Sequence, residues 1–268
     1  MKIKHLQLNT SILRSPEKVI RLVREGEIDV ACLQEITYTN GEQSPLVKLV
    51  GDIGYFYIEG VHFCQESNNQ LLAAAIISKF PIVDYYVNYY NSPEYEPKLI
   101  KESDLIGKNI LGDNEEVDNF PGSRGLKHWL KSRAILTAVV DTGEGMLRVM
   151  TTHYTVSDHC TETVQMYEMS KIISSLVKFS NNKIPTIFSG DLNIRPESYS
   201  VAKLSEVMTC HTKDIGDTLA KTHIARQHGF PDGLALDHVF SKGLAHKQTG
   251  VLDVDFSEHK AVISVFEK

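Results

Sequence analysis

The sequence predicts an α/β protein in which two similar layers form one domain over residues 1–268. Short apolar runs rich in β-branched residues alternate with segments of helical periodicity, and both halves of the chain run strand, helix, strand. No low-complexity segment or linker separates regions of different composition, and one large domain can accommodate this length. These observations favour two layers of one domain over two separate domains.

The composition, 42% hydrophobic and 23% charged, is typical of a globular protein. The formal net charge of −6 argues against a strongly basic nucleic-acid-binding protein. It leaves a phosphorylated substrate open, because a bound divalent cation can supply local positive charge. The four cysteines form no C-x-x-C pair, so neither a zinc site nor a redox motif is indicated. Without an apolar signal segment or a membrane-spanning run, we expect a cytoplasmic protein.

The chain opens with a predicted strand, helix and strand, a βαβ-like arrangement. The first strand covers residues 3–8 and is followed by Asn9. A helix over residues 15–26 begins with Ser-Pro-Glu and ends with glycine. The second strand, residues 29–35, is expected to end in Gln34 and Glu35.

The later elements follow from the same signals. We expect helices at 45–51, at 162–178 and shortly after 198, and strands at 55–59, 71–78, 82–87, 134–140, 146–152, 184–189, 234–240, 252–256 and 261–266. Residues 88–132 are predicted to form a long irregular loop, which is typical of a functional or mobile connection. Basic residues surround the only tryptophan at 124–133. This pattern indicates either a wall that binds phosphates and bases or an amphipathic helix with solvated charges.

Asp191 and Asn193 follow the buried strand at 184–189. They are two residues apart in extended chain, so their side chains point the same way. A packed strand fixes the loop that it carries, which favours a functional site. The alternative is an Asx-turn that only closes the strand.

Other polar residues stand at the ends of further predicted strands, Asn9, Glu35, His153, Glu258 and His259, and Asp237 lies within the strand predicted at 234–240. Carboxylate and amide oxygens suit Mg²⁺ or Mn²⁺. Imidazoles can hold a phosphate or transfer protons. This inventory predicts a metal-dependent site that acts on a phosphoester.

The ordered set of motifs resembles the endonuclease/exonuclease/phosphatase superfamily, with its deoxyribonuclease I-like fold. The matching segments are Leu8-Asn9, Leu33-Gln34-Glu35, Ser78-Lys79-Phe80-Pro81, Thr152-His153, Gly190-Asp191-Leu192-Asn193, Leu236-Asp237-His238 and Ser257-Glu258-His259. The resemblance covers nearly the whole chain. It implies a four-layer αββα sandwich of two mixed β-sheets flanked by helices.

The resemblance also implies roles for the site residues. Mg²⁺ or Mn²⁺ would be held by five residues: Asn9, Glu35, Asp191, Asn193 and Glu258. Asp191 would orient or deprotonate the attacking water, and Asn193 would hold that water or the phosphoryl oxygens. His259, oriented by Asp237, would contact the phosphate, as would His153 from another side. Arg133 and Arg195 are candidate substrate contacts, and the remaining histidines are expected on the surface or in the core. Glu258 stands where the family usually has aspartate, so its role is less well defined.

The implied activity is a metal-dependent phosphodiesterase, with DNA or RNA as the expected substrate. The alternative is a hydrolase of a small or lipid phosphoester, similar to sphingomyelinases or inositol phosphatases. The basic stretch at 124–133 supports the first, and the acidic net charge supports the second. A non-catalytic binding module is disfavoured, because all core motif positions are filled. No protein partner is indicated.

Overall fold

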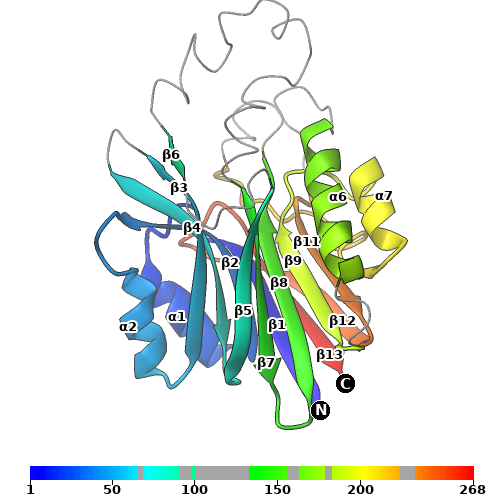
Figure 1. Ribbon diagram of the computed structural model, residues 1–268, viewed down its shortest axis with the longest axis horizontal. Helices are drawn as coiled ribbons and strands as arrows, with labels where there is room; N and C mark the ends of the chain where they lie inside the picture. Colours follow the sequence, from blue (N-terminus) through cyan, green and yellow to red (C-terminus); the bar gives the residue numbers. More distant parts are fainter. Residues whose placement is uncertain (66–68, 91–97, 101–132, 156–162, 179–182, 224–232) are drawn as a thin grey trace, which may run out of the picture.

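Two β-sheets pack face to face in the computed structural model, and helices cover the outer faces (Figure 1). The structure describes residues 1–65, 69–90, 98–100, 133–155, 163–178, 183–223 and 233–268. Among these residues, no helix is long and apolar enough to cross a membrane.

The first sheet contains seven of the described strands, and it brings together strands from both ends of the chain. In spatial order they are β12 (Ala245–Leu252), β13 (Ala261–Glu267), β1 (Lys2–Asn9), β2 (Val30–Thr39), β4 (Gln70–Ser78), β3 (Phe56–Gln65) and β6 (Lys98–Ile100). The pairs β1–β2 and β3–β6 are parallel, and the other neighbours are antiparallel. The sheet is therefore mixed.

The second sheet contains six of the described strands. Their spatial order is β10 (Thr209–Cys210), β11 (Asp237–Lys242), β9 (Thr186–Asp191), β8 (Met146–His153), β7 (Ala134–Asp141) and β5 (Ile82–Tyr89). Only β8 and β9 run parallel among these pairs. Strands β7 and β8 form the hairpin predicted around residues 142–145, and Thr142 N–H donates to the Gly145 carbonyl at 3.2 Å.

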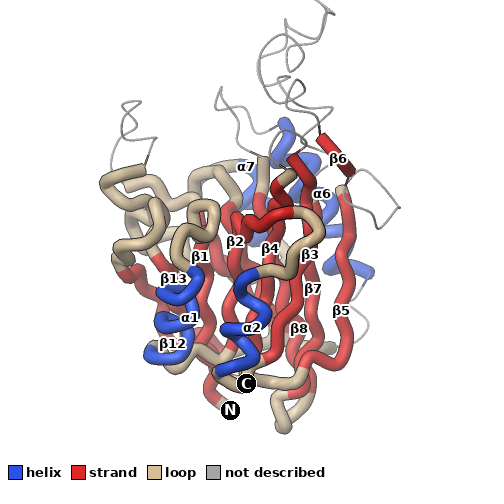
Figure 2. The backbone as a smooth tube through the Cα atoms, turned by 90° about the vertical axis from the view of Figure 1, so that its left-hand side faces the viewer, coloured by secondary structure: helices blue, strands red, loops and turns tan. Residues whose placement is uncertain are grey.

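In the described part of the chain, two helices cover each sheet. On the first sheet lie α1 (Pro16–Glu25) and α2 (Pro45–Asp52), which stand in front of the strands in Figure 2. On the second lie α6 (Thr163–Lys178) and α7 (Tyr199–Ser205). Separate apolar clusters join each helix pair to its sheet, and a third cluster lies between the sheets. The result is the predicted four-layer αββα sandwich.

Several predicted strand ends were wrong. Strand β3 continues to Gln65 beyond the predicted residue 59, and β9 ends at Asp191 instead of residue 189. Strand β2 does not end at Glu35 but continues to Thr39, because Ile36 resumes pairing with β4 after a bulge. Strand β11 begins at Asp237, which was expected in mid-strand. The segment before it bonds Thr218 instead of a neighbouring strand: Thr218 N–H donates to the Leu234 carbonyl at 2.9 Å.

The strand predicted at 252–256 was also wrong. The strand in this region is β12, Ala245–Leu252, an edge strand that is largely exposed and so lacks an apolar pattern. Val254 and Phe256 alternate with aspartates as strand residues would, but they pack onto the α1–α2 side of the first sheet from a loop. The predicted loop at 88–132 begins inside β5 and includes β6, and its remaining segments lie outside the described residues.

Candidate active site

Three neighbouring strands of the second sheet place polar side chains in one row. His153 ends β8, Asp191 ends β9 and Asp237 begins β11. Asp191 is the register partner of both His153 and Asp237. On the facing sheet, Asn9 ends β1 at the same end of the sandwich. Both sheets therefore contribute to one cluster of buried polar groups.

Glu35 reaches this cluster from a bulge inside β2. Its backbone is left-handed, with φ +58°, and the regular pairing with β4 breaks between Leu33 and Ile36. Its Oε1 accepts a hydrogen bond from Asn9 Nδ2 at 3.0 Å, and its Oε2 accepts from Ile12 N–H at 3.0 Å. The bulge removes Glu35 from the ladder and directs its half-buried carboxylate to Asn9.

The amide that holds Glu35 belongs to a left-handed turn. Ser11, Ile12 and Leu13 all have positive φ, between 49° and 60°. Asn9 Oδ1 accepts from Ser11 N–H, and the Ile12 carbonyl accepts from Thr37 Oγ1. Such backbone costs a non-glycine residue about 1–2 kcal/mol, and surrounding contacts must hold it in place.

The Asp191 carboxylate lies at the centre of the cluster and is buried. Its Oδ1 accepts from the Asn193 N–H at 3.0 Å, and its Oδ2 accepts from Asn9 Nδ2 at 2.9 Å. Two imidazole nitrogens face the same Oδ2, His153 Nε2 at 3.5 Å and His259 Nε2 at 3.7 Å. Burial raises the pKa of Asp191, and Asp237 adds to the rise while His259 opposes it.

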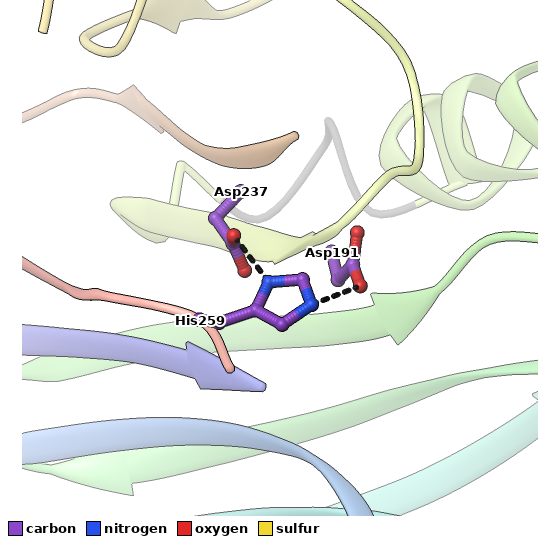
Figure 3. A group of neighbouring side chains, drawn as sticks. All are labelled: Asp191, Asp237 and His259. Carbon is purple, nitrogen blue, oxygen red and sulfur yellow. Dashed lines mark hydrogen bonds and ion pairs between the residues drawn. The ribbon is translucent and has the colours of Figure 1, made fainter. Parts of the chain in front are cut away.

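His259 lies between two carboxylates (Figure 3). Its Nδ1–H donates to Asp237 Oδ2 at 2.8 Å, so Nε2 is the nitrogen directed at Asp191. Burial alone would lower the pKa of His259, but the charges of Asp237 and Asp191 outweigh burial and raise it. His259 is therefore positively charged at neutral pH.

His153 has the opposite protonation state. Burial lowers its pKa well below the ordinary value, and the charges of Arg133, His62 and His259 lower it further. Arg133 is buried as well, and its positive charge interacts with Glu168, Glu35 and Asp191. The neutral imidazole of His153 and the positively charged guanidinium of Arg133 thus lie on the side of Asp191 away from Asp237.

Glu168 is an acidic residue whose charge interacts with Arg133. It is buried in α6, and its carboxylate accepts hydrogen bonds from Thr155 N–H at 3.1 Å and Thr155 Oγ1 at 2.8 Å. Burial raises the pKa of Glu168 to about 7, although Arg133 opposes the rise.

The side chains of three predicted site residues are not placed at the centre of the site by the contacts described above. Asn193 has left-handed backbone, and its Nδ2 donates to the Tyr154 carbonyl at 3.0 Å. Glu258 pairs with Arg14 at 3.4 Å. Arg195 is exposed on the loop that follows Asn193. The predicted roles of Asn193 as a ligand, of Glu258 and of Arg195 therefore stay predictions.

The structure adds His223 to the site. Its ring stands perpendicular to the His259 ring, with centroids 5.1 Å apart. His223 was expected on the surface or in the core, because the irregular segment that carries it has no periodicity. Leu219, however, forms an isolated antiparallel β-bridge with His259, and this contact brings the segment to the site.

The donor set fits a hard divalent cation. Glu35 Oε1 and Asp191 Oδ2 both lie within 3.0 Å of one Asn9 nitrogen, so two carboxylates converge. Asp191, Asp237 and His259 also offer ligand atoms within 4.8 Å of one another. His259 Nδ1 is engaged by Asp237, so oxygen atoms dominate the remaining donors. Asn9 can add its own oxygen only if its amide turns over.

The sequence profile of the Endonuclease/Exonuclease/phosphatase family matches residues 6–259, which include every motif of the site. The chain belongs to this family. Family members are phosphoric ester hydrolases, and they are generally dependent on divalent metals. No curated protein matches the sequence.

Solved structures of the endonuclease/exonuclease/phosphatase family have the same fold. A member from Beutenbergia cavernae gives a TM-score of 0.70 at 16% identity, covering 99% of this chain and 71% of that one. A Bacteroides vulgatus member gives 0.69 at 13% identity, covering 100% and 99%. The catalytic domain of human nocturnin, with bound sulfate, gives 0.67 at 15% identity, covering 99% and 94%. The deoxyribonuclease I-like sandwich expected from the motifs is confirmed.

Proposed function

We propose that this chain is a divalent-metal-dependent phosphodiesterase whose substrate is a DNA or RNA strand. The observation that carries the proposal is the surroundings of Asp191. One buried carboxylate faces a charged imidazole, a neutral imidazole and the Asn9 amide, and a second carboxylate, Glu35, lies beside it. Such a site can activate water and stabilise negative charge at the same place. The family description names endonucleases and exonucleases alongside phosphatases, so nucleic-acid substrates are within its range.

Asp191 is proposed to orient the attacking water and accept its proton. A general base works best when its pKa lies near the working pH, and burial moves the pKa of Asp191 upward in that direction. The N–H groups of Asn193 and Asn9 fix the carboxylate, so its orientation does not depend on the substrate.

The two histidines are proposed to contact the phosphate in different ways. His259 carries a positive charge and is oriented by Asp237, so it can stabilise the charge that grows on the phosphoryl oxygens. His153 is neutral and can donate one hydrogen bond without adding charge. The buried Arg133 supplies a second positive charge nearby.

Glu35 and Asp191 would hold Mg²⁺ or Mn²⁺, and Asn9 would join them if its amide turned over. Bound there, the cation would neutralise charge on phosphoryl oxygens. Such ions commonly bind through one or two carboxylates together with substrate phosphates. The half-buried position of Glu35 is consistent with this arrangement.

The test is hydrolysis of bis-p-nitrophenyl phosphate, of single- and double-stranded DNA and of RNA, with Mg²⁺ or Mn²⁺ and with chelator. We expect metal-dependent cleavage that falls by about 10²–10⁴-fold in Asp191→Asn, as for loss of a general base. Asp84→Asn, an exposed carboxylate on β5, is the matched control and should keep full activity. Silence on every substrate together with no metal binding would overturn the proposal.

A small or lipid phosphoester is the second candidate substrate, and the net charge of −6 favours it. The dependence of KM on salt concentration distinguishes the two candidate substrates. Binding of a polymeric nucleic acid releases counterions, so its KM should rise steeply between 50 and 200 mM salt, on the order of tenfold or more. A small phosphodiester should show a weak dependence. Cleavage of bis-p-nitrophenyl phosphate without cleavage of DNA or RNA would select the second candidate.

A further inference from the structure

The face of β1 directed at the other sheet is polar along most of its length. Leu6 and Leu8 pack on the α1 side, whereas His5, Gln7 and Asn9 are buried and bond groups of the second sheet. Asn9 belongs to the site described above. Gln7 lies one step deeper between the sheets, and no role has yet been assigned to it.

Gln7 contacts the carboxylate that orients His259. Its Nε2 donates to Asp237 Oδ1 at 3.3 Å and also to Gln34 Oε1. Gln34 Nε2 in turn donates to Gln7 Oε1 at 3.1 Å and to Thr151 Oγ1 at 2.8 Å. The two carboxamides are thus bonded to each other in both directions.

The direction of these bonds is set by Asp237. An ionised carboxylate only accepts, so the Gln7 nitrogen, not its oxygen, must face it. Gln7 Oε1 is then directed at Gln34, whose nitrogen is held by Thr151. Neither carboxamide can turn over without leaving a buried donor or acceptor unpaired, which is unfavourable.

This arrangement gives each Asp237 oxygen its own partner. Oδ1 accepts from Gln7 and Oδ2 accepts from His259 Nδ1. A carboxylate held at both oxygens cannot rotate, and it therefore fixes the plane of the His259 ring. The ring then directs Nε2 at Asp191, 3.7 Å away.

We propose that Gln7 is a positioning residue for the Asp237–His259 pair, supported from behind by Gln34 and Thr151. Gln7 itself touches no reacting atom. Its kinetic effect rests on the proposed phosphodiesterase function, whereas its effect on the His259 ring does not.

His5 offers a matched control. It lies on the same face of the same strand, is equally buried, and its Nε2 shares a hydrogen bond with Ser189 Oγ at 3.1 Å. Ser189 is not a site residue. Loss of either side chain removes a buried polar contact between the sheets, but only Gln7 is joined to Asp237.

The experiment compares Gln7→Met, which keeps the length but removes the amide, with His5→Leu. Gln7→Asn, whose amide is one methylene shorter, is a second variant in case the first does not fold. Two readouts are used: the Nδ1–H proton of His259 in ¹⁵N-labelled protein, and kcat and KM on bis-p-nitrophenyl phosphate with Mn²⁺. Thermal melting checks folding.

For the Gln7 variants we expect the His259 Nδ1–H signal to broaden or vanish through faster exchange. We expect kcat to fall by about 10–100-fold, as for loss of other orienting partners, with KM nearly unchanged. His5→Leu should melt earlier but keep the signal and kcat. A folded Gln7→Met protein with an intact signal and kcat would overturn the proposal. If the wild type cleaves nothing, the proposed function fails, and the proton signal alone decides the role of Gln7.

Discussion

Glu35 shows how one residue is fixed at the site. Its left-handed backbone would cost about 1 kcal/mol or more elsewhere. Here the bulge in β2 and the two hydrogen bonds from Asn9 and Ile12 hold it. Its carboxylate is therefore presented in one orientation, with its partners in place before any ion binds.

Glu35→Gln tests this residue as a metal ligand. The amide keeps the size but loses the negative charge and one acceptor, so we expect affinity for Mn²⁺ to fall at least about tenfold. Isothermal titration calorimetry measures the affinity, and Glu42→Gln, an exposed residue before α2, is the control. An unchanged affinity would place the cation elsewhere.

Motifs at strand ends identified which residues meet, because a strand end delivers its side chain to a defined edge. Asn9 and Asp191 illustrate this, and the structure places them together. The same reasoning could not find His223, which an irregular segment carries to the site. It also could not assign charge to the two histidines, since that depends on contacts across both sheets.

At the scale of elements, the parallel pair β8–β9 brings His153 beside Asp191. The pair is unusually close at Gly190, where an added Cβ would lie 2.2 Å from the Thr152 carbonyl oxygen. That contact is with backbone and cannot be relieved by a rotamer change. Glycine is therefore required one residue before Asp191 for steric reasons.

Gly190→Ala is expected to push β8 and β9 apart, to lower the free energy of unfolding by about 1–3 kcal/mol and to reduce activity. Gly250→Ala is the matched control, because a Cβ there on edge strand β12 meets nothing within 4 Å. Urea denaturation and hydrolysis rates measure both variants. Equal behaviour of the two would show that the strands can separate without cost.

Some elements with a strong apolar pattern were predicted nearly to the residue, whereas an element without one was missed. Strand β4 is buried from Ala73 to Ser78, and its continuous apolar run identified it. Edge strand β12 is exposed and has no apolar pattern, so its sequence did not predict a strand. The bulge in β2 depends on pairing with β4, and no local pattern in the sequence marks it.

At the scale of the whole molecule, the first and last strands lie side by side, with β1 between β13 and β2. One apolar cluster spans both sheets. Neither sheet could be removed without exposing that cluster to water. We therefore propose that residues 1–268 fold as one cooperative domain.

Glu168 makes the free energy of unfolding of this domain depend on pH. Its folded pKa of about 7 exceeds the ordinary 4.5, so its contribution to stability is full below pH 4.5 and is lost as pH rises through 7. Compared with Glu168→Gln, the wild type should lose up to about 3 kcal/mol of unfolding free energy between pH 4 and pH 8. Urea denaturation at both pH values measures this, with Glu206→Gln as the exposed control. A pH-independent difference would contradict the expectation.

In the left-handed turn at Ser11, Ile12 and Leu13, a substitution that raises thermal stability is expected to lower activity. Glycine adopts positive φ without steric penalty, so selection for thermal tolerance alone would favour glycine at Ile12, which is about half exposed. The same change would loosen the segment whose amide holds Glu35. Directed evolution for thermal stability is therefore expected to select a substitution in this turn that lowers activity. Such a trade-off is common where a strained segment forms part of a site.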